Sequence, residues 1–297
     1  MKILILGASG MLGNTLFRSL SNKYEVIGTL RNYQGLERFF ATDKHKLFCG
    51  VDICNSGNIE QVFSFYRPDV IINCVGIIKQ LQASKLYHDS VYVNSFLPHE
   101  LLKICEIHGA KLIHFSTDCV FSGKHGGYLE SDFADADDLY GRSKYLGEVG
   151  YNSNAITLRT SIIGHELNSN KSLVDWFLSQ NNSVNGYKNA IFSGLPTVEV
   201  ARILSEYILP NISNLSGLYH LSVDAIDKFS LLKIIANHYS KKIDIVEDYN
   251  LKIDRSLNSA IFQQVTGYVP PTWNELITLM YQDYMNFFRE KHNNEKK

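Results

Sequence analysis

The chain has 297 residues, a hydrophobic fraction of 45%, a charged fraction of 20% and a formal net charge of -1. This length is enough to bury the core of one large α/β domain or of two smaller domains. The nearly neutral charge gives no long-range field that would attract nucleic acid or an anionic membrane, so neither is an expected partner. We also expect no transmembrane helix, because no run of about 18 apolar residues is present.

The first half of the chain alternates short apolar runs with amphipathic stretches. The apolar runs predict strands at Lys2–Gly7, Glu25–Arg31, Lys46–Asp52, Val70–Gly76, Lys111–Thr117 and Ala155–Ile163. The amphipathic stretches predict helices at Met11–Leu20, Ile59–Tyr66, Val91–His108 and Leu139–Val149. Continuously apolar strands separated by helices are typical of a parallel sheet that is covered on both faces. The predicted fold is therefore α/β, with a doubly wound parallel sheet of the Rossmann type that binds dinucleotides.

The pattern changes after Gly164. Asn and Ser cluster at Asn168–Ser172 and Gln180–Asn185, which predicts loops. Further helices are predicted at Thr197–Ile208, Phe229–Tyr239 and Trp273–Arg289, with a short apolar run at Leu218–Val223. We predict a dinucleotide-binding domain over residues 1–164 and a smaller, mixed substrate-binding region over residues 165–297. Part of residues 187–224 is a candidate to return to the first domain.

The N-terminus and the cysteines indicate the cellular compartment of the protein. The segment MKILILGASG reaches glycine after a few apolar residues, so it predicts a buried strand rather than a signal peptide. The five cysteines are odd in number and form no C-x-x-C pair, which suits reduced thiols in a cytoplasmic protein. The ten histidines show no H-E-x-x-H spacing, so we expect no metal site.

The segment GASGMLG places three glycines between the first strand and the first helix. Gly7 permits the turn, Gly10 lets a pyrophosphate approach the backbone, and Gly13 allows close contact between helix and strand. The N-terminus of the following helix offers free N–H groups and partial positive charge to phosphates. A plain tight turn is the alternative interpretation. The predicted cofactor-binding residues of this turn are Gly7, Ser9, Gly10, Met11, Leu12 and Gly13.

Other strand ends supply the remaining candidates for the cofactor. Arg31 lies where an acidic residue would accept the ribose 2′-hydroxyl of NAD, so it favours the 2′-phosphate of NADP, with NAD still possible. A solvent-facing arginine is the alternative. Asp52 is a candidate to accept from the adenine amino group, with Ile53 beside it, or else it caps a loop. The end of the fourth strand adds Cys74, Val75 and Gly76, where a glycine would let the cofactor lie against the backbone.

Tyr140 and Lys144 are four residues apart, which places them on one face of a helix. A phenol has an ordinary pKa of about 10, and a neighbouring ammonium would lower it and make the phenol a general acid. Thr117, at the end of the fifth strand, is a candidate to hydrogen-bond the same substrate oxygen. A surface pair is the alternative for Tyr140 and Lys144. The carboxyl ends of the strands form one crevice, so these groups are expected to meet the glycine turn there.

The sequence resembles the extended short-chain dehydrogenase/reductase superfamily and, within it, the dTDP-4-dehydrorhamnose reductase branch. The spacing from Glu130 and Asp132 to Tyr140 also fits this branch. The resemblance covers the N-terminal half and thins beyond Gly164. It implies NADPH-dependent reduction of the 4-keto group of a nucleotide-diphospho-6-deoxy sugar for surface polysaccharide synthesis. The segments that carry it are GASGMLG at 7–13, NCVG at 73–76, STDCVFSG at 116–123, YGRSK at 140–144 and LRTSIIG at 158–164.

The resemblance also implies roles for individual residues. Tyr140 would protonate the C4 carbonyl oxygen, Lys144 would hold the nicotinamide ribose, and Thr117 would orient the carbonyl. Asn94 looks like an asparagine that supports this site, and a helix-surface amide is the alternative. Two departures from the branch concern the substrate: ADADDL replaces a stretch that usually contains proline, and Cys119 replaces an aromatic residue.

A nucleotide-sugar substrate carries a diphosphate, which calls for cations in the crevice. Lys79 and Arg255 are the predicted substrate-binding cations, together with Asp118 as a polar contact. Arg159 is an alternative, although an arginine inside a strand is commonly paired structurally. Trp176 and Trp273 would either stack on the base or belong to the core.

Other functions remain open. The substrate would be dTDP-linked or UDP-linked, including a 4-keto-6-deoxy acetamido sugar. Epimerase or dehydratase activity is a further possibility, although Thr117-Asp118 supplies only one carboxylate where dehydratases place an acid and a base. A non-catalytic, NADP-binding regulatory subunit is the alternative of another class, because the beta subunit of methionine adenosyltransferase is similar to the same branch. A homodimer is possible.

Overall fold

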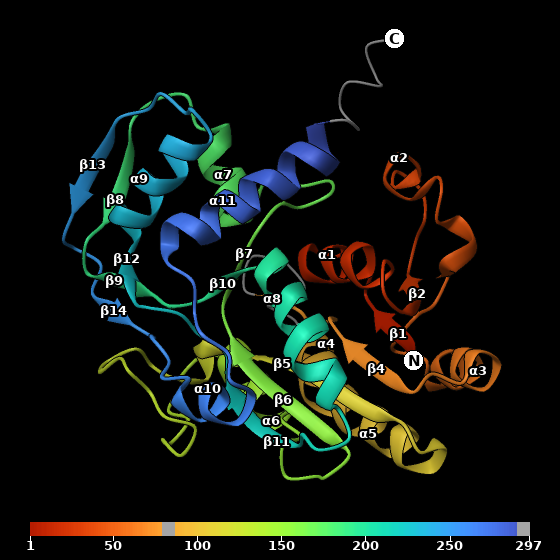
Figure 1. Cartoon of the computed structure of the whole chain (residues 1–297). Coiled ribbons are helices and arrows are strands. Elements are labelled where there is room, and N and C mark those ends of the chain that lie inside the picture. The colour runs from red at the N-terminus through yellow and green to blue at the C-terminus, as the bar shows by residue number, and fades with distance from the viewer. Residues whose placement is uncertain (79–86, 290–297) are drawn as a thin grey trace.

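The computed structural model describes residues 1–78 and 87–289. A seven-stranded parallel sheet lies at its centre, with the strand order β11-β6-β5-β4-β1-β2-β3 (Figure 1). The order reverses between β1 and β4, which is where an open α/β sheet forms its ligand crevice. The predicted doubly wound Rossmann fold is thus confirmed. The strands are β1 (Lys2–Leu6), β2 (Glu25–Leu30), β3 (Leu47–Cys49), β4 (Val70–Asn73), β5 (Lys111–Thr117), β6 (Ala155–Thr160) and β11 (Gly217–His220).

Helices cover both faces of this sheet (Figure 1). In β1, Ile3 and Ile5 belong to the core beneath α1 and α8, whereas Leu4 and Leu6 belong to the core beneath α3 and α5. Alternate side chains of a strand point to opposite faces, so one short apolar strand serves two cores. The covering helices are α1 (Met11–Leu20), α3 (Ser56–Tyr66), α4 (Tyr87–Val91), α5 (Leu97–His108), α6 (Leu139–Leu146) and α8 (Thr197–Ile203).

The C-terminal half adds a lobe of small sheets and helices at one side of the main sheet (Figure 1). Its sheets are β10-β7, β12-β9-β14 and β13-β8. Strand β11 leaves this lobe and pairs with β6 in the main sheet. The division at residues 164 and 165 stays a prediction. The strands are β7 (Ile162–Ile163), β8 (Val184–Tyr187), β9 (Ala190–Phe192), β10 (Leu195–Pro196), β12 (Ile226–Asp227), β13 (Ile245–Asp248) and β14 (Ile253–Asp254). The helices are α7 (Leu173–Ser179), α9 (Lys228–His238), α10 (Ala260–Thr266) and α11 (Trp273–Asp283), with the short α2 (Glu37–Phe40) in the first half.

Several predicted bounds needed correction. The third strand is only Leu47–Cys49, because Lys44–Lys46 form a 3₁₀ turn before it and Gly50 follows at φ +78°. The predicted strand Ala155–Ile163 is interrupted at Ser161, where β6 gives way to β7. The predicted helix Val91–His108 contains a turn of π-helix at Tyr92–Phe96 between α4 and α5. The strand at Lys111–Thr117 and the helix at Met11–Leu20 have the predicted ends.

Within residues 1–78 and 87–289, the helices are too short or too polar to cross a membrane. The same residues contain no cluster of three or more His, Cys, Asp or Glu side chains that could hold a metal ion. All five cysteines are free thiols.

Candidate active site

The glycine turn after β1 has the shape that a pyrophosphate requires. Gly7 has φ +80°, which an L side chain rarely adopts, and a Cβ at Gly13 would lie 2.1 Å from the Gly7 carbonyl oxygen. Gly10 caps α1 without any side-chain hydrogen bond to the first N–H groups of the helix. These N–H groups are free to bind an anion, and Ser9 and Gly10 are exposed beside them. Leu12 is buried, so its side chain belongs to the core and only its N–H is offered.

Arg31 follows β2 and Asp52 follows β3, and these two strands are neighbours in the sheet. Arg31 is exposed, and its charge partly opposes the rise that burial causes in the pKa of the Cys54 thiol. Asp52 accepts a hydrogen bond from the Cys54 N–H at 3.0 Å, which is the loop-capping alternative. Ile53 is buried. The exposed edge of the crevice therefore carries one cation beside a capped loop.

The segment after β4 runs past the glycine turn. A Cβ at Gly7 would lie 2.9 Å from Val75 Cγ2, so Cys74 to Gly76 border the turn directly. The Asn73 side chain accepts a hydrogen bond from the Val75 N–H at 3.1 Å and fixes this segment. Burial raises the pKa of the Cys74 thiol, and the Lys144 charge opposes the rise. The structure thus brings Lys144 close to the predicted cofactor strand.

Thr117, Tyr140 and Lys144 lie together at the end of β5 and the start of α6. Asp138 caps α6 by accepting from the Gly141 N–H at 2.8 Å, which orients the first turn that carries Tyr140. Lys144 is 4% exposed and its Nζ donates to the Phe115 carbonyl at 2.6 Å. Burial lowers the pKa of Lys144 to about 8, with the charges of Glu148 and Cys74 acting in the opposite direction.

The expected lowering of the Tyr140 pKa is wrong for this structure. Burial raises the pKa of the phenol, Cys119 and Asp118 raise it further, and hydrogen bonding with Thr117 lowers it in part. Lys144 is not among the main groups that shift this pKa, and its ammonium donates to the Phe115 carbonyl. The phenol therefore stays protonated at neutral pH, and it can donate its proton or a hydrogen bond.

Asn94 is a buried clamp rather than a surface amide. It lies in the π-helical turn at 1% exposure, and its side chain accepts from the Ile77 N–H at 2.9 Å and donates to the Ile77 carbonyl at 3.0 Å. It also donates to Ser143 Oγ at 3.1 Å, one residue before Lys144. The surface alternative is thus wrong. Turns of π-helix often occur at functional sites, and this one ties the segment after β4 to the helix of Tyr140 and Lys144.

The predicted substrate cations have different outcomes. Arg255 donates from Nε to the Phe121 carbonyl at 2.7 Å, and its charge opposes the rise that burial causes in the pKa of Asp118. Arg159 is 2% exposed and forms a two-point ion pair with Glu148, so its substrate-binding alternative is wrong. Lys79 lies outside the described residues. Of the two tryptophans, Trp176 is exposed on α7 and Trp273 is buried, where its Nε1 donates to the Asp224 carbonyl.

Lys228 is a site residue that the sequence did not reveal. It is the first residue of α9, and the predicted helix began one residue later. Asp118 and Cys119, which are distant from Lys228 in the sequence, raise the pKa of its ammonium against the lowering that burial causes. A lysine after a capping aspartate is an ordinary local pattern, so only the folded chain distinguishes it.

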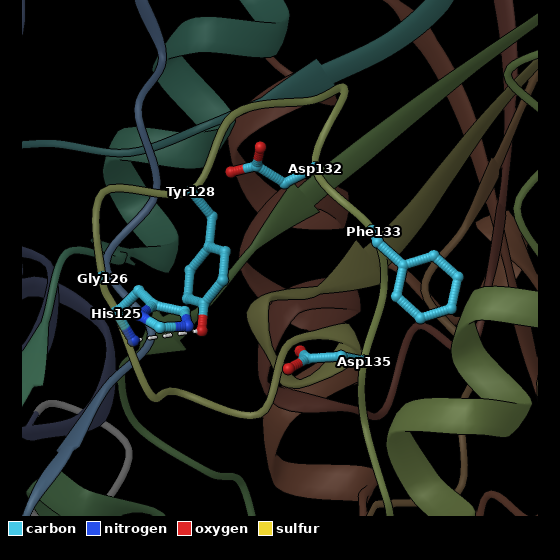
Figure 2. Close-up of a pocket in the computed structure, with 6 residues that line it drawn as sticks. All are labelled: His125, Gly126, Tyr128, Asp132, Phe133 and Asp135. Atoms are coloured by element: carbon cyan, nitrogen blue, oxygen red, sulfur yellow. Dashed lines mark hydrogen bonds between the residues drawn. The ribbon is translucent and has the colours of Figure 1, made fainter.

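The loop between Asp118 and Tyr140 lines an open pocket of about 380 Å³. Figure 2 shows the side chains of Tyr128 and Asp135 on this loop, with Phe133 directed away from them. Tyr128 stacks on Phe121 with ring centroids 4.1 Å apart, and Asp135 accepts from Ser122 Oγ at 2.6 Å. The loop is thus fixed by its own contacts although the usual proline is absent. The pocket is lined by His125, Gly126, Tyr128, Asp132, Phe133 and Asp135.

Known proteins resemble the whole chain. A family model described as RmlD substrate binding domain matches residues 1–286. A dTDP-4-dehydrorhamnose reductase of Aggregatibacter actinomycetemcomitans is 26% identical, over 93% of this chain and 97% of that protein. The crystal structure of dTDP-4-dehydrorhamnose reductase from Bacillus anthracis in complex with NADP has a TM-score of 0.76 at 22% identity, and covers 95% of this chain and 99% of its own. The methionine adenosyltransferase 2 subunit beta of Danio rerio is 28% identical, but over only 50% of this chain and 42% of that protein.

Proposed function

The chain belongs to the RmlD substrate binding domain family, and from this membership we propose that it is an NADPH-dependent reductase of a nucleotide-diphospho-6-deoxy sugar. The reduced group would be the 4-keto group, as in dTDP-4-dehydrorhamnose reductase, and the product would serve surface polysaccharide synthesis. The observation that carries the proposal is the meeting of Thr117, protonated Tyr140 and Lys144 beside the glycine turn. The similarity over almost the full length to a reductase of this name supports it.

Each residue of this group has a distinct task in the proposed reaction. Tyr140 would donate its proton to the carbonyl oxygen as negative charge develops there. The Thr117 hydroxyl, which donates to Asp118 at 3.1 Å, would turn to donate a hydrogen bond to the same oxygen. Lys144 holds the nicotinamide ribose and, with that contact in place, its charge stabilises the phenolate that Tyr140 leaves behind. NADPH, when bound, supplies the hydride to the carbonyl carbon. The N–H groups of the glycine turn fit its pyrophosphate, and the segment Cys74–Gly76 borders it.

The regulatory alternative finds less support. The likeness to methionine adenosyltransferase 2 subunit beta covers half of this chain. A purely regulatory subunit has no need of buried Thr117 and Lys144 in one cluster with a half-buried Tyr140. The choice between dTDP and UDP, and between a neutral and an acetamido sugar, stays open. A homodimer in the cytoplasm remains a prediction from the sequence.

A panel of enzymatically prepared 4-keto-6-deoxy sugars, linked to dTDP or UDP, tests the proposed reaction. We expect NADPH oxidation, followed as loss of absorbance, with at least one member of the panel. The control is the same assay with the corresponding 4-hydroxy sugar, which has no carbonyl to reduce. NADPH binding without oxidation by any member would favour the regulatory subunit instead.

Arg31→Asp tests the choice of cofactor. The change removes a cation from the proposed 2′-phosphate contact and adds repulsion, so KM for NADPH should rise about 10- to 100-fold. KM for NADH, which has no 2′-phosphate, should change by less than about 3-fold. Lys103→Asp is a control, because it makes the same change of charge at an exposed position of α5. Equal losses for both cofactors would contradict the 2′-phosphate role.

A further inference from the structure

The sheet β12-β9-β14 places two cationic residues near Ile191 of its central strand, one on each side. Asp227 of β12 and Asp254 of β14 are both paired with Ile191 of β9. Lys228 and Arg255 immediately follow these two aspartates. Because neighbouring strands are about 4.8 Å apart, the two backbones lie about 10 Å apart across the sheet, near enough for long side chains to reach one group.

Both cations interact with the chain segment that follows Thr117, Arg255 by a hydrogen bond and Lys228 by its charge. Arg255 donates to the Phe121 carbonyl, and the Asp254 N–H donates to the Gly123 carbonyl at 2.8 Å. These bonds hold the Asp118 end of the segment against the sheet. The positive charges of Arg255 and Lys228 both lower the pKa of Asp118, and Arg255 has the larger effect. Asp118 therefore lies in the electrostatic field of both cations.

The charge of Lys228 is coupled to the residues next to the reacting phenol. Asp118 and Cys119 raise the pKa of Lys228, and the same two residues raise the pKa of Tyr140. Arg255 is held by the carbonyl of Phe121. A substrate whose carbonyl meets Tyr140 would present its nearest ring substituents to Asp118 and Lys228.

The position of the Lys228 ammonium is unfavourable in the folded chain. Among the described residues, no hydrogen-bond or ion-pair partner contacts its ammonium, although most of the side chain is out of solvent. Burial disfavours the charged form. The first turn of a helix is also an unfavourable place for a cation, because the partial charge there is positive. The three N–H donors of this ammonium are thus available to a ligand.

We propose that Lys228 recognises the sugar ring of the substrate by donating a hydrogen bond to an oxygen substituent near the reacting carbonyl, while Asp118 accepts from a neighbouring hydroxyl or amide. This role rests on the proposed reductase function. The oxygen belongs either to a ring hydroxyl or to the carbonyl of an acetamido group, since both accept from an ammonium. Arg255 remains the cation for the diphosphate.

Lys228→Met should raise KM for the 4-keto sugar nucleotide about 10- to 100-fold, which corresponds to the loss of one hydrogen bond to a charged group. The affinity for NADPH and for the bare nucleoside diphosphate, dTDP or UDP, should stay within about 2-fold, because neither contains the 4-keto sugar ring. Lys228→Arg should restore part of the loss, since it keeps the charge and the donors. Lys233→Met is the matched control, an exposed lysine on the same helix, and should leave all constants unchanged.

Three outcomes would overturn the proposal. An unchanged KM in Lys228→Met would exclude any contact with substrate. An equal loss for the bare nucleoside diphosphate would assign Lys228 to the diphosphate. Failure of Lys228→Arg to improve on Lys228→Met would leave only a packing role. Circular dichroism checks that each variant is folded, and Lys228→Gln replaces the methionine variant if the latter is unstable.

Substrate analogues distinguish the two sources of the oxygen. If a ring hydroxyl is the partner, the corresponding deoxy analogue should show no difference between wild type and Lys228→Met. If the acetamido carbonyl is the partner, replacing that group by hydrogen should abolish the difference. A difference that survives in both analogues would contradict recognition of the sugar.

The same variants separate this proposal from the proposed reaction. If wild type turns over no 4-keto sugar, the reductase function fails, and equilibrium binding still tests Lys228. Wild type should bind dTDP-glucose or UDP-glucose more tightly than the matching nucleoside diphosphate, and Lys228→Met should lose this preference. Equal preference in both proteins would overturn the role of Lys228 whatever the reaction is.

Discussion

Tyr140→Phe is expected to lower kcat by about 10²- to 10⁴-fold, which is the usual contribution of a general acid. The phenylalanine ring fills nearly the same space, so the change removes the proton donor and little else. The phenol is buried and protonated, beside Thr117 at the end of β5. Stopped assays with the substrate identified from the panel measure kcat, and fluorescence titration measures Kd for NADPH, which should not change.

Tyr145→Phe is the matched control for this variant. Tyr145 lies on the same helix, is 44% exposed, and should tolerate the loss of its hydroxyl with no change in kcat. A Tyr140→Phe protein that keeps its full kcat would contradict the proton-donor role. If Kd for NADPH rose in parallel with the loss of kcat, Tyr140 would be a cofactor ligand instead of an acid.

Arg159→Met is expected to reduce the free energy of unfolding by about 3–5 kcal/mol, the usual cost of breaking a buried ion pair from one side. Arg159 and Glu148 are joined by two bonds of 2.8 Å, and their side chains are 3% and 9% exposed. Ser116 also donates to Glu148 at 2.7 Å, so the pair lies directly beneath the catalytic strand. Without Arg159, the Ser116 hydroxyl would be the remaining hydrogen-bond partner of the Glu148 carboxylate among the described residues.

Urea denaturation followed by circular dichroism measures this loss. Lys2→Met is the control, because Lys2 and Glu25 form an exposed pair at 3.8 Å and its removal should cost only about 0–1 kcal/mol. A loss below about 1 kcal/mol for Arg159→Met would show that water or a neighbouring group compensates the carboxylate. In that case the pair contributes little to the stability of the site.

The main sheet was predictable because its information is local. A continuous apolar run such as Lys111–Thr117 fits a buried parallel strand and little else, and its ends were predicted correctly. The π-helical turn was not predictable, since one additional residue in a turn barely alters the apolar periodicity of Val91–His108. Likewise, nothing near Leu47–Cys49 indicated that the third strand would be so short.

The candidate site was predictable only in part. The glycine turn and the pair Tyr140 and Lys144 have fixed spacings, so they could be found from the sequence. The direction of the Tyr140 pKa could not, because it depends on burial and on where the Lys144 ammonium points. Lys228 depends on β12 pairing with β9, a contact between distant segments that no local pattern announces.

The side chain of Asn94 has a mechanical consequence. Three hydrogen bonds link one amide to both sides of the crevice, two to Ile77 and one to Ser143. Each such bond contributes about 1 kcal/mol, and the Ser143 side is held by only one of the three, so separating the two sides at that bond would cost about 1 kcal/mol. The strand exit at Ile77 and the helix of Lys144 are therefore coupled through the Asn94 side chain, and a displacement on the cofactor side that keeps this bond also displaces the proton donor's helix.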